Sequence, residues 1–361
     1  MNANLAVKQG VMSNRSAPLF AGLLCLACAA LGASSASPQA GPIYIITKSV
    51  ALGAPDHWDL LSFEPASHRV YVAHGDRVSV VDGQSGSLVG QVEGFPGGTH
   101  GVALLPELGR GYSDDGKAGT AASFELSTFK LVKTIKADAD ADAIVFDPAS
   151  GHVFVIDAEP GKVTVIDPKS DTSVATIDGG GKLEIGVADG SGSLFVNGEA
   201  NREIVRIDTR ANRVSAHWSI PQCVSPHGIA IDPKTRRLFT SCENNVLLVV
   251  DADHGSVIAS LPIGARTDGA AFDPVRKRVF SSNGDGTLTV ILEKDASTFE
   301  VEATVPTVIG ARTMTLDPKT GRLYLMAADF KVNEAAAATD YRNRYKVTPG
   351  SAKLLFLDPS P

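Results

Sequence analysis

Beyond its first forty residues the sequence lacks any apolar run of the roughly 18 residues that a membrane-spanning helix needs, so we expect no membrane span. It also lacks clusters of lysine and arginine interleaved with aromatic residues, which make up only 6% of the 361 residues. Because nucleic acids are bound by such clusters, their absence argues against a nucleic-acid partner. The chain is 43% hydrophobic, with 35 glycines and 20 prolines. This composition excludes collagen, coiled coil and bulk disorder, and it favours many short strands.

The first forty residues have the features of an export signal. They contain Lys8 and Arg15, no acidic residue, the apolar stretch APLFAGLLCLACAALGA and the small-residue tract SSASPQA. This order is typical of a Sec-type signal peptide over residues 1–40, cleaved after Ala36 or Ala40. We therefore expect a periplasmic or secreted protein. Removing the two cations of the leader changes the net charge from −7 to −9.

A strand-like pentamer, usually followed by an acidic residue and proline, recurs along the chain, as in DAIVF-DP and HGIAI-DP. It occurs seven times at a mean spacing of about 42 residues, which is the length of a propeller blade. Each repeat continues with an apolar strand, a polar turn, an alternating strand and a fourth segment such as SVATI. The pattern predicts an all-β fold, a seven-bladed β-propeller of four-stranded antiparallel blades. The last pentamer residues are Phe63, Leu104, Phe146, Ala188, Ile231, Phe272 and Leu316.

The seventh repeat ends at Pro361 after its third strand, KLLFLD, and has no fourth strand of its own. The segment IYIITKSVALGA, which precedes the first repeat, is similar to the fourth-strand segments of other repeats. We therefore predict that residues 43–50 complete the last blade by pairing with residues 353–358, so that no sheet edge stays open. Residues 41–361 are then a single closed propeller, which we expect to be monomeric.

The repeats RVYVA, HVFVI, SLFVN and RLYLM, with HGIAIDP and VTVIDPKSDTSVATI, resemble the YVTN-repeat β-propeller family. Within that family the chain is most similar to the YncE-like exported bacterial members. The resemblance runs from about residue 43 to the C-terminus and implies the same seven-bladed fold. It implies little chemistry, because most members are described as binding proteins, and one branch is associated with single-stranded DNA.

One column of the repeat is ionisable in all seven copies, four residues before the end of each pentamer. The loop that leads into each first strand lies around the channel of a propeller, so these side chains are predicted to form a ring at one channel entrance. They are Asp59, His100, Asp142, Glu184, His227, Asp268 and Arg312, and we call them the channel ring. In blade order each basic member has acidic neighbours. Asp142 and Glu184 form the one adjacent acidic pair.

Two neighbouring carboxylates either share a proton or bind a cation, so Asp142 and Glu184 are the predicted ligands of a divalent cation, if one binds. The alternative is a ring of hydrogen bonds and ion pairs that only locks the blades together. His100 and His227 belong to blades that are nearly opposite, which argues against a shared zinc ion. The sequence has no HExxH motif, no paired CxxC and no convincing nucleophile motif, so we assign no catalytic residue and no certain cofactor.

We therefore expect a non-catalytic, exported propeller that binds a small ligand, a cation or a protein partner at its charged channel face. The alternative is a metal-dependent hydrolase, lactonase or lyase with its metal at the channel mouth, which is an analogy at the level of the fold. Nucleic-acid binding is a second alternative, disfavoured by the acidic charge. The hairpins between second and third strands add polar residues to the same face, each expected to be solvated: His74, Asp114, Asp115, Asp157, Asn197, Glu199, Glu243, Asn244, Asn283, Asp285 and Asp329.

Two cysteines, Cys223 and Cys242, remain after the predicted leader, and they flank the first two strands of the fifth repeat. Antiparallel pairing of these strands brings both to the ring face, close to His227. A disulfide is expected in an oxidising compartment, with free thiols or metal ligation as alternatives.

The seventh repeat carries a stretch of residues, 330–352, between its second and third strands, far longer than an ordinary hairpin loop. Its segment NEAAAATDYRNRY is predicted to form a short helix. The side chains expected to fold over the acidic mouth as a lid are Tyr341, Arg342, Arg344 and Tyr345. The alternative is a disordered insertion.

Overall fold

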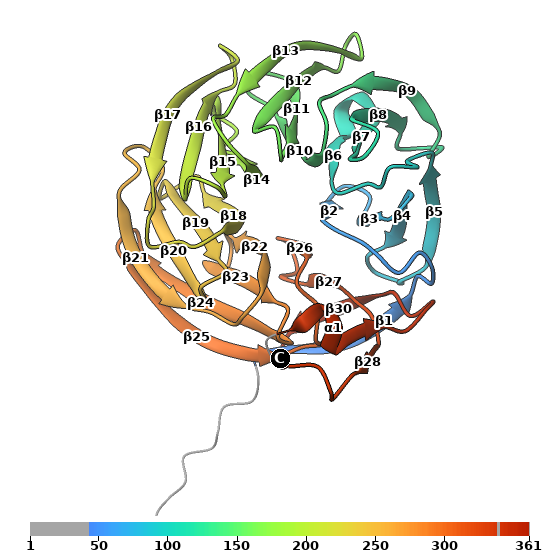
Figure 1. Cartoon of the computed structure of the whole chain (residues 1–361), viewed down its shortest axis with the longest axis vertical. Coiled ribbons are helices and arrows are strands. Elements are labelled where there is room, and N and C mark those ends of the chain that lie inside the picture. Colours follow the sequence, from blue (N-terminus) through green and yellow to red (C-terminus); the bar gives the residue numbers. More distant parts are fainter. Residues whose placement is uncertain (1–42, 338–339, 361) are drawn as a thin grey trace, which may run out of the picture. The chain divides into compact units, whose positions relative to one another are not determined.

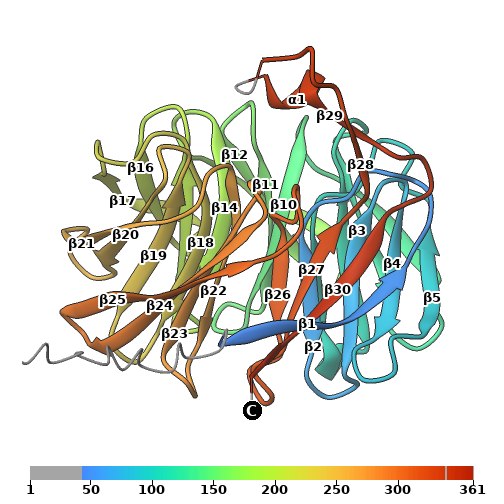
Figure 2. The same cartoon turned by 90° about the horizontal axis from the view of Figure 1, so that it is seen from below.

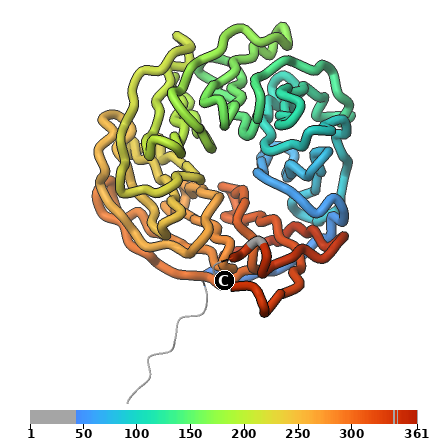
Figure 3. The backbone as a smooth tube through the Cα atoms, in the orientation of Figure 1, coloured from blue at the N-terminus to red at the C-terminus, as the bar shows by residue number. Residues whose placement is uncertain are grey.

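The computed structural model describes residues 43–337 and 340–360, so the predicted signal peptide lies outside the described residues. Seven four-stranded antiparallel sheets surround a central axis and form a seven-bladed β-propeller, which confirms the fold predicted from the repeats (Figure 1). The first strand of each blade lies nearest the axis and the fourth lies outermost, as the backbone trace in Figure 3 also shows. Within the described residues no helix is both long and apolar enough to span a membrane.

The first four blades follow one another along the chain. Blade one comprises β2 (Leu61–Glu64), β3 (Arg69–His74), β4 (Arg77–Asp82) and β5 (Leu88–Glu93). Blade two comprises β6 (Val102–Leu105), β7 (Arg110–Asp115), β8 (Thr120–Glu125) and β9 (Leu131–Lys136), with the 3-10 helix η1 (Pro106–Leu108). Blade three comprises β10 (Ala141–Asp147), β11 (His152–Asp157), β12 (Lys162–Asp167) and β13 (Thr172–Asp178). Blade four comprises β14 (Leu183–Ala188), β15 (Ser193–Gly198), β16 (Glu203–Asp208) and β17 (Arg213–Ser219).

The remaining three blades include the strand that closes the ring. Blade five comprises β18 (Pro226–Asp232), β19 (Arg237–Cys242), β20 (Val246–Asp251) and β21 (Val257–Pro262). Blade six comprises β22 (Thr267–Asp273), β23 (Arg278–Asn283), β24 (Thr287–Asp295) and β25 (Thr298–Pro306). Blade seven comprises β26 (Met314–Leu316), β27 (Leu323–Ala327), β30 (Lys353–Pro359) and β1 (Tyr44–Ala51). Between β27 and β30 lie β28 (Phe330–Val332), α1 (Tyr341–Arg344) and β29 (Tyr345–Val347).

The N-terminal strand β1 closes the propeller. It pairs antiparallel with β30, from Tyr44 opposite Pro359 to Ala51 opposite Lys353, as Figure 2 shows from the side. Tyr44 is fully buried and its ring meets Phe280 of blade six edge-on at 5.4 Å. The predicted closure is therefore confirmed. It covers the edge of β30 with a strand from the other end of the chain.

The core lies between neighbouring blades, because the middle strands of each blade are buried on both faces. One hydrophobic cluster joins Phe154 of blade three to Leu194 and Val205 of blade four, and other clusters repeat this arrangement around the ring. Every blade contributes one buried aromatic side chain at the same place in its second strand. These are Tyr71, Tyr112, Phe154, Phe195, Phe239, Phe280 and Tyr324. Tyr44, Phe95, Phe124 and Phe356 add further buried rings, so half of the few aromatic residues of the chain are buried in the core.

Candidate functional site

Each channel-ring residue lies at or just before the start of the first strand of its blade. In blades three to six the strand pairing shifts at this point, for example between Ala141 and Ala143, so that Asp142 has no partner of its own on β11. The corresponding shifts lie between Leu183 and Gly186, Pro226 and Ile229, and Thr267 and Gly269. Such bulges change the direction of a side chain. Here they accompany Asp142, Glu184, His227 and Asp268 at the channel mouth.

Three residues of the ring form a cluster around one imidazole. Nδ1 of His100 lies 2.8 Å from Oδ1 of Asp142 and 3.1 Å from Oδ2 of Asp59, although the three residues belong to three different blades. Burial lowers the pKa of His100, but the hydrogen bonds to Asp142 and Asp59 outweigh it and raise that pKa to about 11. The imidazole is therefore protonated near neutral pH and its proton serves both carboxylates.

Asp114 lies behind this cluster and is completely buried. Its two oxygens accept hydrogen bonds from the backbone N–H groups of His100 and Gly101, at 2.5 and 2.8 Å. Burial raises the pKa of Asp114 to about 8, and burial also raises the pKa of Asp59 to about 6. This part of the mouth therefore holds more carboxyl groups than its one imidazolium can neutralise.

The other four ring residues form a second cluster around His227. Nδ1 of His227 lies 3.8 Å from Glu184 and 3.7 Å from Asp268, and Nε2 lies 3.5 Å from Glu243. Arg312 completes the series, with Nε 3.1 Å from Asp268. The seven ring residues thus form two contiguous clusters, and every member has at least one ring partner of opposite charge or an imidazole.

Asp142 of the first cluster and Glu184 of the second are the two acidic ring residues that are neighbours in blade order. Burial raises the pKa of Glu184 to about 9, followed in effect by the negative charges of Asp142 and Asp268. The three groups whose ligand atoms lie within 4.8 Å of one another are Asp59, His100 and Asp142, a set that excludes Glu184. In that set the proton on His100 already sits between the two carboxylates.

Several hairpin residues of the ring face are buried, so the environment predicted for them is wrong. His74, Asp114, Asp115, Asp157, Asn197 and Asn283 were expected to be solvated, but all are buried. They lie at the ends of the second strands of their blades, and hydrogen bonds to backbone or hydroxyl groups are made by His74, Asp114, Asp157, Asn197 and Asn283. Asn197, for instance, donates to the His227 carbonyl at 2.7 Å and accepts from the Thr240 hydroxyl at 3.0 Å. A layer of buried polar side chains therefore lies next to the channel ring, at the ends of the second strands.

The channel wall beyond the first cluster carries uncharged side chains. A cavity of about 340 Å³ is lined by the first strands of blades one, two, three and seven. Its lining residues are Leu61, Ser62, Phe63, Val102, Ala103, Leu104, Ile144, Val145, Phe146 and Thr315. The pentamer residues that define the repeat thus line the channel, while the ring residues lie at its mouth.

Cys223 and Cys242 form the predicted disulfide, with Cα atoms 5.2 Å apart and 19 residues of separation. Both residues are fully buried. Ser225 and Glu243, the neighbours of the two cysteines, contact Nε2 of His227 at 3.4 and 3.5 Å. The cross-link therefore fixes the backbone that carries the His227 cluster.

The long insertion of blade seven lies on the ring face, where Figure 2 shows α1 beyond the ends of the propeller strands. The Arg266 guanidinium stacks on the Tyr341 ring at 3.8 Å, and Tyr341 contacts Tyr345 at 4.7 Å. On the return to β30, the carboxylate of Asp56 accepts the N–H groups of Gly350 and Ser351 at 2.7 and 3.0 Å. The insertion is thus attached to blades six and one, next to the channel mouth.

Comparisons with known proteins identify the class of fold. No family model matches the chain, and no curated protein matches its sequence. Among solved structures, a chain of hydrazine synthase from Kuenenia stuttgartiensis aligns with a TM-score of 0.64 at 17% identity, covering 80% of this chain and 94% of that one. A chain of the mitotic checkpoint complex aligns with a TM-score of 0.68 at 15% identity, covering 86% and 93%. At such identities the likeness shows the fold alone, which is a seven-bladed β-propeller.

Proposed function

We propose that the protein is an exported, monomeric, non-catalytic β-propeller that binds a cation at its channel mouth, either a divalent metal ion or the cationic group of a small ligand. The observation that carries the proposal is electrostatic: burial, together with the negative charge of Asp142 from the neighbouring blade, raises the pKa of the Glu184 carboxyl to about 9. Carboxylate oxygens are the preferred ligands of hard divalent cations. The cavity below the ring leaves room for the rest of a small ligand.

The charge balance supports a cation rather than an anion. Around the mouth, Asp59, Asp114 and Glu184 all have raised pKa values because they are buried among further carboxylates. A cation placed beside Glu184 would lower that repulsion and displace the proton. We therefore expect cation binding to release a proton near neutral pH and to strengthen as the pH rises toward 9.

Isothermal titration calorimetry tests this proposal. The protein is titrated with Ca²⁺, Mn²⁺ and putrescine in two buffers of different ionisation enthalpy. Glu184→Gln should abolish both binding and proton release. Glu159→Gln should change neither, because Glu159 is a 68% exposed carboxylate whose nearest cation, Lys182, is 3.5 Å away. If the protein binds none of the three cations, the proposal is wrong.

A metal-dependent hydrolase or lyase is the second candidate, favoured by the close approach of Asp59, His100 and Asp142. Metal binding there would require His100 to give up the proton that both carboxylates share. The two candidate functions predict different effects of the same two substitutions. Asp59→Asn removes a ligand of the enzymatic site and leaves the Asp142–Glu184 pair intact, whereas Glu184→Gln does the reverse.

Export and family membership belong to the same proposal. They are supported by the leader-like segment around Arg15, by the YVTN-like repeats and by the Cys223–Cys242 disulfide, which suits an oxidising compartment. The proposed location predicts a mature N-terminus after Ala36 or Ala40. Mass spectrometry of the protein from a periplasmic extract measures it directly.

A further inference from the structure

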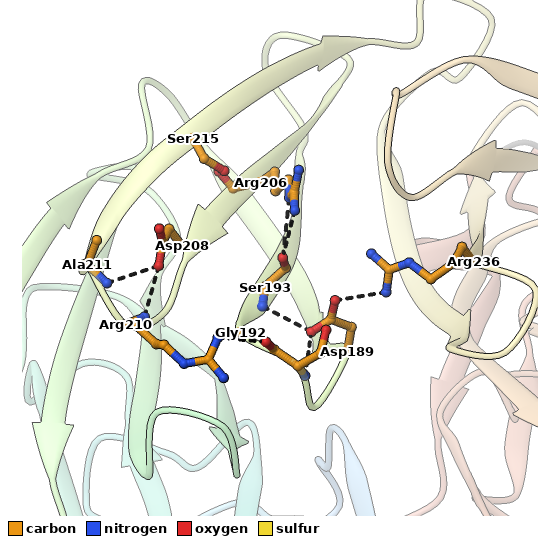
Figure 4. Close-up of a pocket in the computed structure, with 10 residues that line it drawn as sticks. Asp189, Gly192, Ser193, Arg206, Asp208, Arg210, Ala211, Ser215 and Arg236 are labelled. Atoms are coloured by element: carbon orange, nitrogen blue, oxygen red, sulfur yellow. Dashed lines mark hydrogen bonds and ion pairs between the residues drawn. The ribbon is translucent and has the colours of Figure 1, made fainter.

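A second polar pocket lies at the opposite ends of the strands from the channel ring, between blades four and five. It has a volume of about 540 Å³, within the range of small-molecule sites, and Figure 4 shows its side chains. The turn from β14 to β15, the hairpin from β16 to β17 and Arg236 of blade five line it. The proposed cation site contributes none of these residues.

Arg206 interrupts a column that is uncharged in every other blade. It lies opposite Phe195 in the strand pairing of β15 and β16. In the other six blades, the residues opposite the same aromatic are Val80, Ser123, Val165, Val249, Val290 and Phe356, all fully or almost fully buried. The fold therefore does not require an arginine at this place. The repeats provide an internal comparison that marks blade four as different.

Ser193 is the second departure, and it opens the space that the guanidinium enters. The other six blades have a large basic residue at this position: Arg69, Arg110, His152, Arg237, Arg278 and Arg322. The Ser193 hydroxyl accepts hydrogen bonds from Nε and Nη2 of Arg206 at 3.3 and 3.1 Å (Figure 4). Because the hydroxyl accepts both bonds, its own proton can be donated to a ligand.

The turn before Ser193 is also unusual. Gly190 replaces the proline that follows the first strand in the other blades, and three residues separate Asp189 from Ser193, against four between Asp147 and His152. A Cβ atom on Gly192 would meet Nη1 of Arg210 at 2.1 Å. Only glycine at this position lets Arg210 approach the turn, where it donates to the Ser191 carbonyl at 2.7 Å.

Arg206 and Arg210, two of the three arginines of the blade-four hairpin, have no carboxylate at ion-pair distance in the described residues. Within the described part of the chain, no ion pair includes Arg206 or Arg210, whereas Arg236 contacts Asp189 at 2.8 Å and Asp253 at 2.9 Å. The two acidic side chains that line the pocket, Asp189 and Asp208, accept hydrogen bonds from the turns that carry them. Asp189 also accepts the N–H groups of Ser191 and Ser193, and Asp208 accepts those of Arg210 and Ala211.

We propose that this pocket, hereafter the blade-four pocket, binds a small organic molecule through a phosphate or carboxylate group held by Arg206, Arg210 and the Ser193 hydroxyl. A guanidinium offers a planar fork of donors that matches both kinds of oxyanion. The Arg206 guanidinium also lies over the Trp218 ring, 6.0 Å from its centroid. The pocket is larger than one oxyanion needs, so the ligand carries further polar groups.

The test measures binding of inorganic phosphate, glucose 6-phosphate and citrate to the complete protein by calorimetry. At least one of them should bind with a dissociation constant below about 1 mM. Arg206→Val installs the residue that Val165 and Val249 already provide in other blades, so this variant should fold with an unchanged or higher melting temperature. It should weaken binding at least about tenfold, because a charge-assisted hydrogen bond is lost.

Two further variants keep the result unambiguous. Ser193→Ala removes the hydroxyl that positions the Arg206 guanidinium and should also weaken binding, whereas Arg213→Ala, on the same hairpin but outside the pocket lining, should not. Preference for glucose 6-phosphate or for citrate identifies the oxyanion as phosphate or carboxylate. Absence of binding by all three probes, or binding that Arg206→Val and Ser193→Ala leave unchanged, would overturn the proposal.

Discussion

Oδ1 of Asp142 lies 2.8 Å from Nδ1 of His100, although the two residues come from neighbouring blades and are 42 positions apart in the sequence. The sequence separation of the two residues equals the length of one repeat. It joins blade two to blade three at the channel mouth, and Asp59 joins blade one to the same imidazole. The ring therefore links consecutive blades while concentrating charge at one end of the channel.

The stability of the protein should fall as the pH rises from about 5 to about 10. Burial raises the pKa of Glu184 from 4.5 to about 9 and that of Asp114 from 3.8 to about 8, and the hydrogen bonds to Asp142 and Asp59 raise that of His100 from 6.5 to about 11 despite its burial. In this range the folded state binds more protons than the unfolded state, so the free energy of unfolding decreases with pH.

Urea unfolding at a series of pH values measures this slope. Glu184→Gln should make it shallower, because the amide stays neutral throughout. Glu159→Gln, at the exposed position described above, should leave it unchanged. A free energy of unfolding that rises over this pH range would contradict the assignment of the raised pKa values.

Closure of the ring depends on the buried end of β1. Tyr44→Ala should reduce the free energy of unfolding by about 3 kcal/mol, since it removes a buried aromatic ring from the junction with blade six. Ile45→Ala is the matched control in the same strand, because Ile45 is 40% exposed and should cost well under about 1 kcal/mol. Chemical denaturation measures both. Equal losses in the two variants would show that β1 does not contribute through its buried face.

Loss of the disulfide should destabilise the protein by about 3 kcal/mol in the chain-entropy estimate. The cross-link closes a segment of 19 residues and is fully buried, so Cys223→Ala with Cys242→Ala should lower the midpoint of urea unfolding. Reductant should lower the midpoint of the original protein and have no effect on the double variant. If reductant leaves the original protein unchanged, the bond does not stabilise the fold.

The insertion of blade seven should open when its stacking contact is removed. Tyr341→Ala eliminates the contact with Arg266, and a cation–π contact of about 1 kcal/mol corresponds to roughly fivefold more frequent opening. Trypsin should therefore cut faster after Lys331 or Lys346, which gel analysis over time reveals. Ligand bound at the mouth should slow this cleavage if the insertion acts as the predicted lid. Unchanged cleavage in the variant would contradict the role of the stack.

The repeat length allowed the number of blades, the closing strand and the disulfide to be predicted. Seven pentamers at regular spacing fix which residue of each blade faces the axis, so one column of ionisable residues pointed to the channel ring. Nδ1 of His100 lies within 3.1 Å of both Asp59 and Asp142, while a binding role for the ring stays a prediction. The periodicity of the sequence was sufficient to predict these features because every blade repeats the same strand order.

Structural features that depart from the repeat could not be predicted from the periodicity of the sequence. The bulge around Asp142 changes the strand pairing without a residue type that marks it. Burial of Asp114 depends on two backbone N–H groups of the neighbouring strand, whereas its sequence position indicates only a hairpin. Arg206 and Ser193 were a detectable signal, because comparing the columns blade by blade shows both as exceptions.

Cation binding at the channel mouth is most directly tested by calorimetric titration at pH 7 in two buffers of different ionisation enthalpy. The account predicts binding of at least one of Ca²⁺, Mn²⁺ and putrescine. Binding should release about one proton, because the pKa of Glu184 is raised to about 9, and Glu184→Gln should eliminate both binding and proton release. Failure of all three cations to bind, or binding without proton release that survives Glu184→Gln, would contradict it.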